Sequence, residues 1–313
     1  MCADTIHGEE QRDVVIIGAG AAGTSCALEC FDIQLDTAVF EMDERPGGQL
    51  VEIDHSVRNV ATGSFPDGSA LRDALEESAA ILGDRLRLSH PVTRADLGER
   101  WIEVDGARIR GRTLVIATGT LAQQLPAAED GAFGGDVTYH LDAGLGRFVG
   151  RDVVVVGGGD SATLDALELA REGSRVSLVH RSEALTARHD IVEQVRHEPR
   201  IEDLPGWELD ALDGADRLEA VTIVRRADGQ RRRLAAGGLV LKIARRPRTD
   251  LFRDQIELDR AGAIVVDAEM QASRDGVFAA GDVVAGSYAR VANALGQGAL
   301  AARSVLRYLQ GRM

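Results

Sequence analysis

The stretch that decides the fold is Asp13-Val14-Val15-Ile16-Ile17-Gly18-Ala19-Gly20-Ala21-Ala22-Gly23. Its continuous apolar run is typical of a parallel strand that is covered on both faces, and we expect a helix to follow over 24–30. Gly18 permits a tight turn, Gly20 lets the backbone approach a pyrophosphate, and Gly23 lets the helix pack on the strand. A pyrophosphate is favoured there by the free N–H groups of the helix N-terminus.

Two further strands extend this pattern. The apolar segment 37–40 ends on Glu41, which is placed to accept hydrogen bonds from a ribose diol. A second buried strand ends in the small residues Ala117-Thr118-Gly119, which let backbone come close to a bound ring. Together with the glycine loop, these features predict a dinucleotide-binding unit.

The same pattern returns near the middle of the chain. The strand 153–156 leads into Gly157-Gly158-Gly159-Asp160-Ser161-Ala162, a helix runs to about Arg171, and the strand 175–179 ends on His180. The sequence therefore predicts an α/β protein with two Rossmann-like dinucleotide-binding domains. A second unit with a purely structural role is the alternative.

The second unit differs from the first in charge at the end of its second strand. His180-Arg181 stands there in place of an acid. A cationic pair suits the 2′-phosphate of NADP, whereas an acid suits the bare ribose of NAD. The alternative is a solvated surface pair without a ligand.

Composition narrows the class of protein. The formal net charge of −14 argues against nucleic acid or an anionic membrane as a general partner. No apolar run approaches the roughly 20 residues of a membrane helix, and the polar start lacks the apolar core of a signal peptide. We therefore expect a cytoplasmic protein. The cysteines, Cys2, Cys26 and Cys30, form no Cys-x-x-Cys pair that would spell out a metal site or a redox dithiol.

Five motifs carry a resemblance to a known family, and they are Gly18-x-Gly20-x-x-Gly23, Gly47-Gly48-Gln49-Leu50, Ala117-Thr118-Gly119, Gly157-x-Gly159-x-x-Ala162 and Gly276-Val277-Phe278-Ala279-Ala280-Gly281-Asp282. With them the chain resembles the low-molecular-weight thioredoxin reductases, a family of FAD- and NADPH-dependent flavoproteins that are usually homodimeric. The resemblance implies two three-layer ββα domains, with the NAD(P) domain (122–246) inserted into the FAD domain (1–121 and 247–313).

The resemblance also implies cofactor contacts. Glu41 would hold the adenosine ribose, Val92 would pair with adenine, and Asp282 would bind the ribityl chain. Arg290-Val291 would lie beside the pyrimidine end of the flavin. The full set is Gly18, Gly20, Ala22, Gly23, Glu41, Gly48, Gln49, Asn59, Val92, Ala117, Thr118, Gly119, Gly281, Asp282, Arg290 and Val291 for FAD, and Gly157, Gly159, Asp160, Ser161, Ala162, His180 and Arg181 for NADPH.

One segment departs from the family. Where thioredoxin reductases carry Cys-Ala-Thr-Cys-Asp, this chain has His140-Leu141-Asp142-Ala143-Gly144. Without a thiolate there is no thiol exchange on the enzyme. We therefore expect an FAD oxidoreductase that is not a thioredoxin reductase and that acts on a small molecule. His140 would be its acid or base, with Asp142 orienting it. The alternative is that His140 only fills the space of the cysteines.

The nicotinamide site departs as well. The family's Gly-His-x-Pro-Asn-Thr becomes Ala244-Arg245-Arg246-Pro247-Arg248-Thr249, and its extra arginines suit an anionic ligand. We therefore expect FAD as a cofactor, and NADPH or another anionic ligand at this second site. Three other functions stay open at this point: a ferredoxin or flavodoxin–NADP reductase, a nicotinamide-independent flavin oxidase, and a non-catalytic flavin-binding redox sensor.

Overall fold

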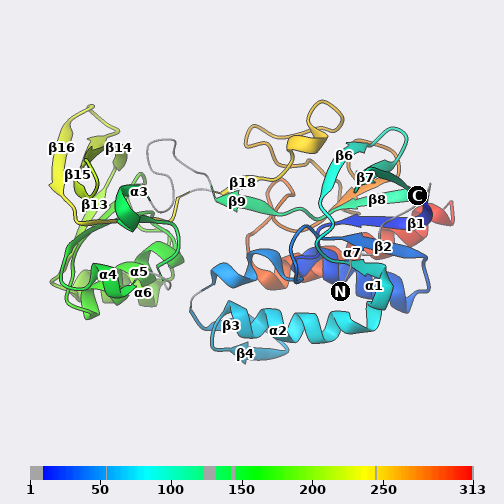
Figure 1. The fold of residues 1–313 in the computed structure, drawn as a ribbon, viewed down its shortest axis with the longest axis horizontal. Helices are drawn as coiled ribbons and strands as arrows, with labels where there is room; N and C mark the ends of the chain where they lie inside the picture. Colours follow the sequence, from blue (N-terminus) through cyan, green and yellow to red (C-terminus); the bar gives the residue numbers. More distant parts are fainter. Residues whose placement is uncertain (1–9, 54, 123–131, 142–144, 244, 312–313) are drawn as a thin grey trace. The chain divides into compact units, whose positions relative to one another are not determined.

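A computed structural model describes residues 10–53, 55–122, 132–141, 145–243 and 245–311. The chain folds as two compact units. The first unit joins residues 1–121 to residues 246–313, and the second unit consists of residues 122–245 (Figure 1). The second unit is therefore an insertion between the two segments of the first.

A seven-stranded sheet forms the centre of the first unit. Its order is β5-β2-β1-β8-β7-β6, and β19 pairs with the end of β8. The strands are β1 Glu10–Ile17, β2 Thr37–Phe40, β5 Leu86–Arg87, β6 Val92–Asp96, β7 Trp101–Val104, β8 Ala107–Ile116 and β19 Val277–Ala279. As the apolar run predicts, residues 14–17 of β1 are buried on both faces, between parallel neighbours β2 and β8. The carboxyl ends of these three strands therefore meet at one edge.

Strand β8 takes part in both parallel and antiparallel pairing. One edge of β8 is parallel to β1 from residue 109 to residue 116. Its other edge is antiparallel to β7 across the turn at Asp105-Gly106 and then parallel to β19. Asp-Gly between two strands favours a tight hairpin turn, and the chain makes one here. The arrangement carries the chain from the hairpin to Ala117-Thr118-Gly119 at the sheet edge.

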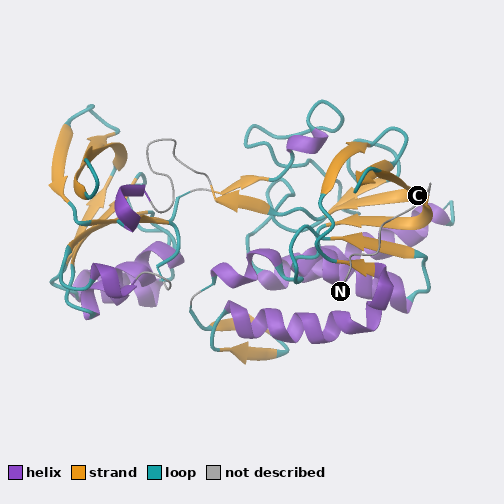
Figure 2. Cartoon of the chain, viewed as in Figure 1, coloured by secondary structure: helices purple, strands orange, loops and turns teal. Residues whose placement is uncertain are grey.

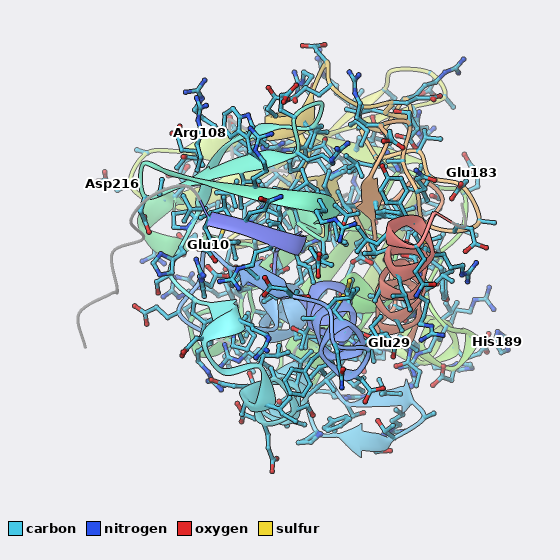
Figure 3. The ribbon with its side chains drawn as sticks, turned by 90° about the vertical axis from the view of Figure 1, so that its right-hand side faces the viewer. Glu10, Glu29, Arg108, Glu183, His189 and Asp216 are labelled. Atoms are coloured by element: carbon cyan, nitrogen blue, oxygen red, sulfur yellow. The ribbon has the colours of Figure 1, made fainter. Side chains whose placement is uncertain are left out.

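Helices cover one face of this sheet (Figure 2). They are α1 Ala21–Asp32, α2 Gly68–Ala79 and α7 Val291–Leu309. Helices α1 and α7 lie side by side, with an Arg303–Glu29 ion pair of 3.8 Å between them (Figure 3). Their approach depends on small residues, because a Cβ at Gly298 would lie 2.1 Å from the carbonyl oxygen of Ala22. The resulting core includes Ala22, Cys26, Ala301 and Val305.

On the opposite face of the sheet, side chains of β7 and of the segment after β18 form a second core. Buried side chains from both meet there, including Ile102, Phe252 and Ile264, each of which is fully buried. Burying a side chain of this size stabilises the fold by about 1.5–3 kcal/mol. The first unit is therefore a three-layer structure.

The second unit repeats the plan with a five-stranded parallel sheet of order β10-β17-β11-β12-β13. Its strands are β10 Val137–Thr138, β11 Asp152–Val156, β12 Arg175–His180, β13 Ile201–Pro205 and β17 Gly238–Leu241. Helices α5 Asp160–Arg171 and α6 His189–His197 pack on one face. The antiparallel sheet β14 Trp207–Gly214, β15 Leu218–Arg225 and β16 Arg231–Ala235 packs on the other. The predicted α/β class with two Rossmann-like domains is confirmed.

A buried carboxylate, Asp136, anchors the start of β10 to β15. It is 1% exposed and accepts hydrogen bonds from Arg217 Nε at 2.5 Å, Arg151 Nη1 at 2.9 Å and the backbone N–H of Leu218 at 3.1 Å. Burial acts to raise the pKa of Asp136, but the bonds from Arg217, Leu218 and Arg151 outweigh it and hold the pKa below its ordinary value. The ionised form therefore stabilises the second unit.

The remaining elements are short, and they are β3 Val57–Val60, β4 Gly63–Phe65, β9 Thr120–Ala122, β18 Arg245–Pro247, α3 Ala132–Gly135, α4 Leu145–Phe148, and the 3₁₀ helices η1 Gly48–Glu52, η2 Ala80–Arg85 and η3 Asp250–Phe252. Strand β3 pairs with β4, and β9 pairs with β18. Among the described residues, no helix has the length and apolar character needed to cross a membrane.

Candidate nucleotide-binding sites

The glycine loop of the first unit has the geometry that its sequence predicts. Gly18 has φ +100°, in the region that favours glycine, and its Cβ would lie 2.6 Å from the carbonyl oxygen of Ala117. A Cβ at Gly23 would lie 1.9 Å from the carbonyl oxygen of Gly18, so α1 is packed directly onto the loop. Gly20, the N-cap residue of α1, has nothing within 4 Å of its Cβ position. The backbone at Gly20 is therefore open to an approaching phosphate.

Glu41 lies beside this loop, at the end of β2. It is 6% exposed, and its carboxylate accepts hydrogen bonds from the backbone N–H groups of Ala19 at 2.7 Å, Met42 at 2.8 Å and Asp43 at 3.1 Å. These bonds fix the carboxylate next to the glycine loop. Oε1 accepts from both Met42 and Asp43, whereas Oε2 accepts only from Ala19 and keeps a lone pair with which it can accept from a ribose hydroxyl.

The segment Gly47-Gly48-Gln49 is brought onto the same loop. The N–H of Gly47 donates to the carbonyl oxygen of Ala19 at 2.8 Å, and the Cβ position of Gly48 is 3.7 Å from the Cα of Gly20. Gln49 reaches the start of β9, where its Oε1 accepts from the hydroxyl of Thr120 at 2.9 Å. Thr120 was missed by sequence reasoning, because a threonine after Ala117-Thr118-Gly119 carries no signal of its own.

The C-terminal part of the chain completes this edge. The N–H of Gly281 donates to Gln297 Oε1 at 2.8 Å, and its Cβ would lie 2.8 Å from the Cβ of Ala22. Gln297 is a second residue that sequence reasoning missed. Arg290 is the N-cap residue of α7, with its guanidinium 4.9 Å from the ring centroid of Tyr288. Val291 begins α7 and packs against the cluster around Leu50.

Two predicted FAD residues lie apart from these contacts. Asn59 is exposed on β3, and Val92 begins β6, opposite Val104. Asp282 is half-buried and follows Gly281 directly. The structure thus gathers the two glycine segments, Glu41, the end of β8 and Gly281 around Gly20. The cofactor roles of the individual residues stay predictions.

The glycine loop of the second unit follows the same design. Gly157 has φ +145°, and its Cβ would lie 2.4 Å from the carbonyl oxygen of Lys242 and 2.9 Å from the Cβ of Ala162. Gly159, the N-cap residue of α5, has nothing within 4 Å of its Cβ position. Asp160 opens α5, and its Oδ1 accepts from the N–H of Arg188 at 2.8 Å. Ser161 is half-buried in the first turn.

His180 and Arg181 differ sharply in environment. Arg181 is exposed, whereas His180 is 3% exposed and lies under the glycine loop, with its Cβ 3.1 Å from the Cβ position of Gly158. His180 Nε2 is 2.8 Å from Asp203 Oδ1, and Nδ1 is buried without a hydrogen-bond partner among the described residues. The alternative of a solvated surface pair is therefore wrong for His180. A buried, unpaired ring nitrogen beside a glycine loop is what a polar ligand would satisfy.

The segment after β12 is fastened to this loop by Thr186. Its N–H and its hydroxyl both donate to the carbonyl oxygen of Gly158, at 2.7 Å and 3.1 Å. No local pattern of the sequence marks Thr186. Its hydrogen bonds depend on how the segment folds back, which the sequence does not reveal.

The predicted catalytic pair is only partly described. His140 is exposed, and its N–H donates to Thr138 Oγ1 at 3.0 Å, while Leu141 beside it is buried. Asp142 lies outside the described residues. The acid–base role of His140 and the orienting role of Asp142 stay predictions.

The described cysteines belong to the first unit, whereas His140 belongs to the second. Cys26 and Cys30 are fully buried, one turn apart on α1. The hydrogen bond with Cys30, together with burial, raises the pKa of the Cys26 thiol well above its ordinary value. A thiol with a raised pKa is a poor nucleophile at neutral pH. Cys2 lies outside the described residues.

Comparison with known proteins identifies a family and several relatives that match nearly the whole chain. Residues 12–298 match the family model described as pyridine nucleotide-disulphide oxidoreductase. The "34.2 kDa protein in rubredoxin operon" of Clostridium pasteurianum is 31% identical over 97% of this chain and 99% of its own length. The thioredoxin reductase of Streptomyces clavuligerus is 33% identical over 95% of this chain and 94% of its own. The solved thioredoxin reductase of Lactococcus lactis superposes with a TM-score of 0.85 at 27% identity, over 96% of this chain and 99% of that one.

These comparisons correct the prediction that the chain is not a thioredoxin reductase and acts on a small molecule. Relatives that bear this name match at about 30% identity over nearly the whole chain. The prediction was wrong because it rested on His140 to Gly144, a short segment of which 142–144 lie outside the described residues. The alternatives drawn from the same segment, namely a ferredoxin reductase, an oxidase and a sensor, are withdrawn with it.

Proteins of this kind bind FAD and NADPH, as predicted. The residues present fit such groups: each unit offers an open glycine at the N-cap of a helix, Gly20 or Gly159, and the second adds the unpaired nitrogen of His180. Family model, relatives and fold agree over nearly the full length. The chain therefore belongs to the pyridine nucleotide-disulphide oxidoreductase family.

Proposed function

We propose that the chain is a flavoenzyme of the thioredoxin reductase type, which passes two electrons from NADPH through FAD to the disulfide of a thioredoxin-like protein. The observation that carries this proposal is the pair of glycine loops, each with one open glycine at a helix N-terminus. The relatives named thioredoxin reductase supply the acceptor class.

We assign FAD to the first unit. Its pyrophosphate would lie at Gly20, where the backbone is open, and its adenosine ribose would bond to Glu41 beside the loop. Gly281 and Asp282 would hold the ribityl chain, and Arg290 would lie at the pyrimidine end. The bound flavin supplies a two-electron carrier between the nicotinamide and the acceptor.

We assign NADPH to the second unit. Its pyrophosphate would lie at Gly159, and its 2′-phosphate would be held by the exposed cation of Arg181 together with His180. The unpaired Nδ1 of His180 supports this assignment, because a phosphate oxygen would give that buried nitrogen a partner. Asp203 on Nε2 would orient the ring.

We also propose that this member works without a redox cysteine pair of its own. Cys26 and Cys30 are buried in a helix, and the raised pKa of Cys26 keeps its thiol protonated. The disulfide that breaks is then the acceptor's. It takes up two electrons and two protons to give two thiols, with the hydride of NADPH and one solvent proton as their sources. Exposed His140 is our candidate for handing over a proton.

A coupled assay tests both parts of this proposal. NADPH oxidation is followed with an oxidised thioredoxin as the acceptor, for the wild type and for the variant Cys2→Ala/Cys26→Ala/Cys30→Ala, with Cys2→Ala alone as the matched control. We expect thioredoxin-dependent turnover in all three. A wild type that binds FAD and NADPH but leaves thioredoxin oxidised contradicts the acceptor class. A triple variant that keeps its flavin but loses turnover contradicts the route without cysteines.

The predicted homodimer and cytoplasmic location remain proposals. Sedimentation of the FAD-loaded protein tests the first: we expect twice the mass of the 33.4 kDa chain. A species of single-chain mass over the working concentration range would contradict it. Fractionation of cells that express the protein tests the second.

A further inference from the structure

Arg248 is held against the FAD edge of the first unit by its backbone. Its N–H donates to the carbonyl oxygen of Gly119 at 2.9 Å, and its carbonyl oxygen accepts from the hydroxyl of Thr118 at 2.8 Å. Thr118 and Gly119 form the end of the small-residue segment that follows β8. Arg248 is therefore fixed at the sheet edge where Glu41 and the glycine loop meet.

The guanidinium of Arg248 is poorly satisfied there. Its Nη1 lies 2.7 Å from the sulfur of Met42, which is only a weak acceptor. Its Nε is buried and has no hydrogen-bond partner among the described residues. Met42 directly follows Glu41, so the guanidinium lies next to the residue proposed to hold the adenosine ribose.

Two neighbouring arginines, unlike Arg248, form ion pairs with an aspartate. Arg246 pairs with Asp250 at 2.7 Å, and Arg253 pairs with the same carboxylate at 3.1 Å. No described acid pairs with Arg248. Glu41 precedes Met42 in the chain, but its carboxylate accepts hydrogen bonds from three backbone N–H groups and not from Arg248. The cation at Arg248 is thus left without a counter-charge from the part of the chain that is described.

A partly buried N–H group without an acceptor lowers the stability of the folded protein. A bound phosphate would remove this penalty by accepting a hydrogen bond from it. The guanidinium presents its N–H groups as a planar fork that matches two oxygens of one phosphate. In the described part of the first unit, the open backbone of Gly20 at the N-terminus of α1 is suited to receive the diphosphate of a dinucleotide. Glu41, which would hold the ribose, would be the link between that diphosphate and Arg248.

We propose that Arg248 is a cofactor-binding residue, whose guanidinium bonds to the anionic ADP half of FAD. The inference rests on the proposed assignment of FAD to the first unit. It goes beyond the motifs of the family, which place asparagine at this position. Binding of the acceptor protein and of NADPH is not involved.

Titration of FAD into apoprotein, followed by flavin fluorescence, tests this proposal. The variants are Arg248→Ala and Arg248→Lys, and the matched control is Arg253→Ala, five residues away on the same unit. A charge-assisted hydrogen bond is worth about 10-fold to 100-fold in an equilibrium constant. We expect the Kd for FAD to rise by about that factor in Arg248→Ala and by less in Arg248→Lys. The control should match the wild type.

Thermal unfolding separates binding from a structural role. The apoprotein of Arg248→Ala should unfold at the wild-type temperature, and only its FAD-loaded form should unfold lower. If the Arg248→Ala apoprotein binds FAD with a Kd within twofold of the wild-type value, the inference about Arg248 is overturned, while the assignment of FAD to the first unit still stands. The inference is also overturned if the apoprotein of Arg248→Ala already shows the whole decrease in unfolding temperature, because the role of Arg248 is then structural. A wild type that takes up no FAD refutes the FAD assignment, and this inference with it.

Discussion

Replacing Gly23 with alanine should destabilise the first unit even without a cofactor. The new Cβ would lie 1.9 Å from the carbonyl oxygen of Gly18 and 3.2 Å from the Cβ of Ala117. A carbon and an oxygen without a bond between them usually stay about 3.3 Å or more apart. Helix α1 would therefore have to withdraw from the loop by more than about 1 Å, because the clashing atom belongs to the backbone.

The expected loss of unfolding free energy follows from two opposing effects. Overpacking of this kind costs about 1–3 kcal/mol, and occasionally more. Replacing glycine by alanine inside a helix returns about 1 kcal/mol. Because backbone on both sides resists the shift, we place the overlap at the upper end of the range and expect a net loss of about 2 kcal/mol.

Gly20→Ala is the matched control in the same loop. Nothing lies within 4 Å of its Cβ position, and its φ of −67° suits alanine. The weaker N-cap and the smaller entropy of the unfolded chain each amount to less than about 1 kcal/mol and oppose each other. The apoprotein should therefore keep its stability, while the methyl group should obstruct a phosphate and weaken FAD binding.

Urea unfolding of the apoproteins measures this contrast. The chain has two tryptophans, Trp101 in the first unit and Trp207 in the second. A Trp207→Phe background leaves Trp101 as the fluorescent reporter of the first unit. The reasoning is refuted if Gly23→Ala unfolds at the same urea concentration as Gly20→Ala, or if Gly20→Ala binds FAD as tightly as the wild type.

Three further predictions concern the second unit. Asp136→Asn should lose about 2 kcal/mol at pH 7, because the buried carboxylate loses its charge-assisted hydrogen bonds to two partly exposed arginines. Since the folded pKa of Asp136 is lowered, this difference should shrink as the pH falls through and below the ordinary value of 3.8, and a pH-independent difference in urea unfolding contradicts the account. His180→Ala should raise the KM for NADPH several-fold and leave the KM for NADH and the flavin content unchanged, with Arg196→Ala on α6 as the control; equal changes for both nucleotides refute a 2′-phosphate role. His140→Ala should lower thioredoxin-dependent turnover about 10²-fold or more, without changing reduction of the flavin by NADPH; full turnover would leave His140 with no catalytic role.

Much of the fold could be predicted because short stretches of sequence specify it. The apolar run 14–17 and the glycines after it fix a strand, a turn and a helix within a dozen residues. The Asp105-Gly106 turn fixes a hairpin in the same way. Boundaries were less accurate: the first helix spans Ala21–Asp32 rather than 24–30, because it begins at the N-cap Gly20 and continues past the last apolar residue of the pattern.

Contacts between distant segments could not be predicted. Gln297 reaches Gly281, Thr186 reaches Gly158, and Arg248 reaches Thr118 and Met42. Each of these depends on tertiary folding, and no local pattern marks the residues that make them. The sequence also showed His180-Arg181 as one cationic pair, whereas burial separates the two side chains.

The function was misjudged from a local pattern as well. The segment that begins at His140 was given more weight than the motifs spread over both units. Those motifs form the glycine loops of both units, and the family model and the relatives match over nearly the whole chain. The segment bears on the route of the electrons after the flavin, which is a narrower question than the type of enzyme.

The most direct test of the account is anaerobic mixing of the FAD-loaded protein with NADPH, followed by oxidised thioredoxin. We expect NADPH to bleach the flavin absorbance, and thioredoxin to restore it with the appearance of two thiols per flavin reoxidised. A flavin that stays oxidised with NADPH, or that stays reduced after thioredoxin is added, would contradict the account.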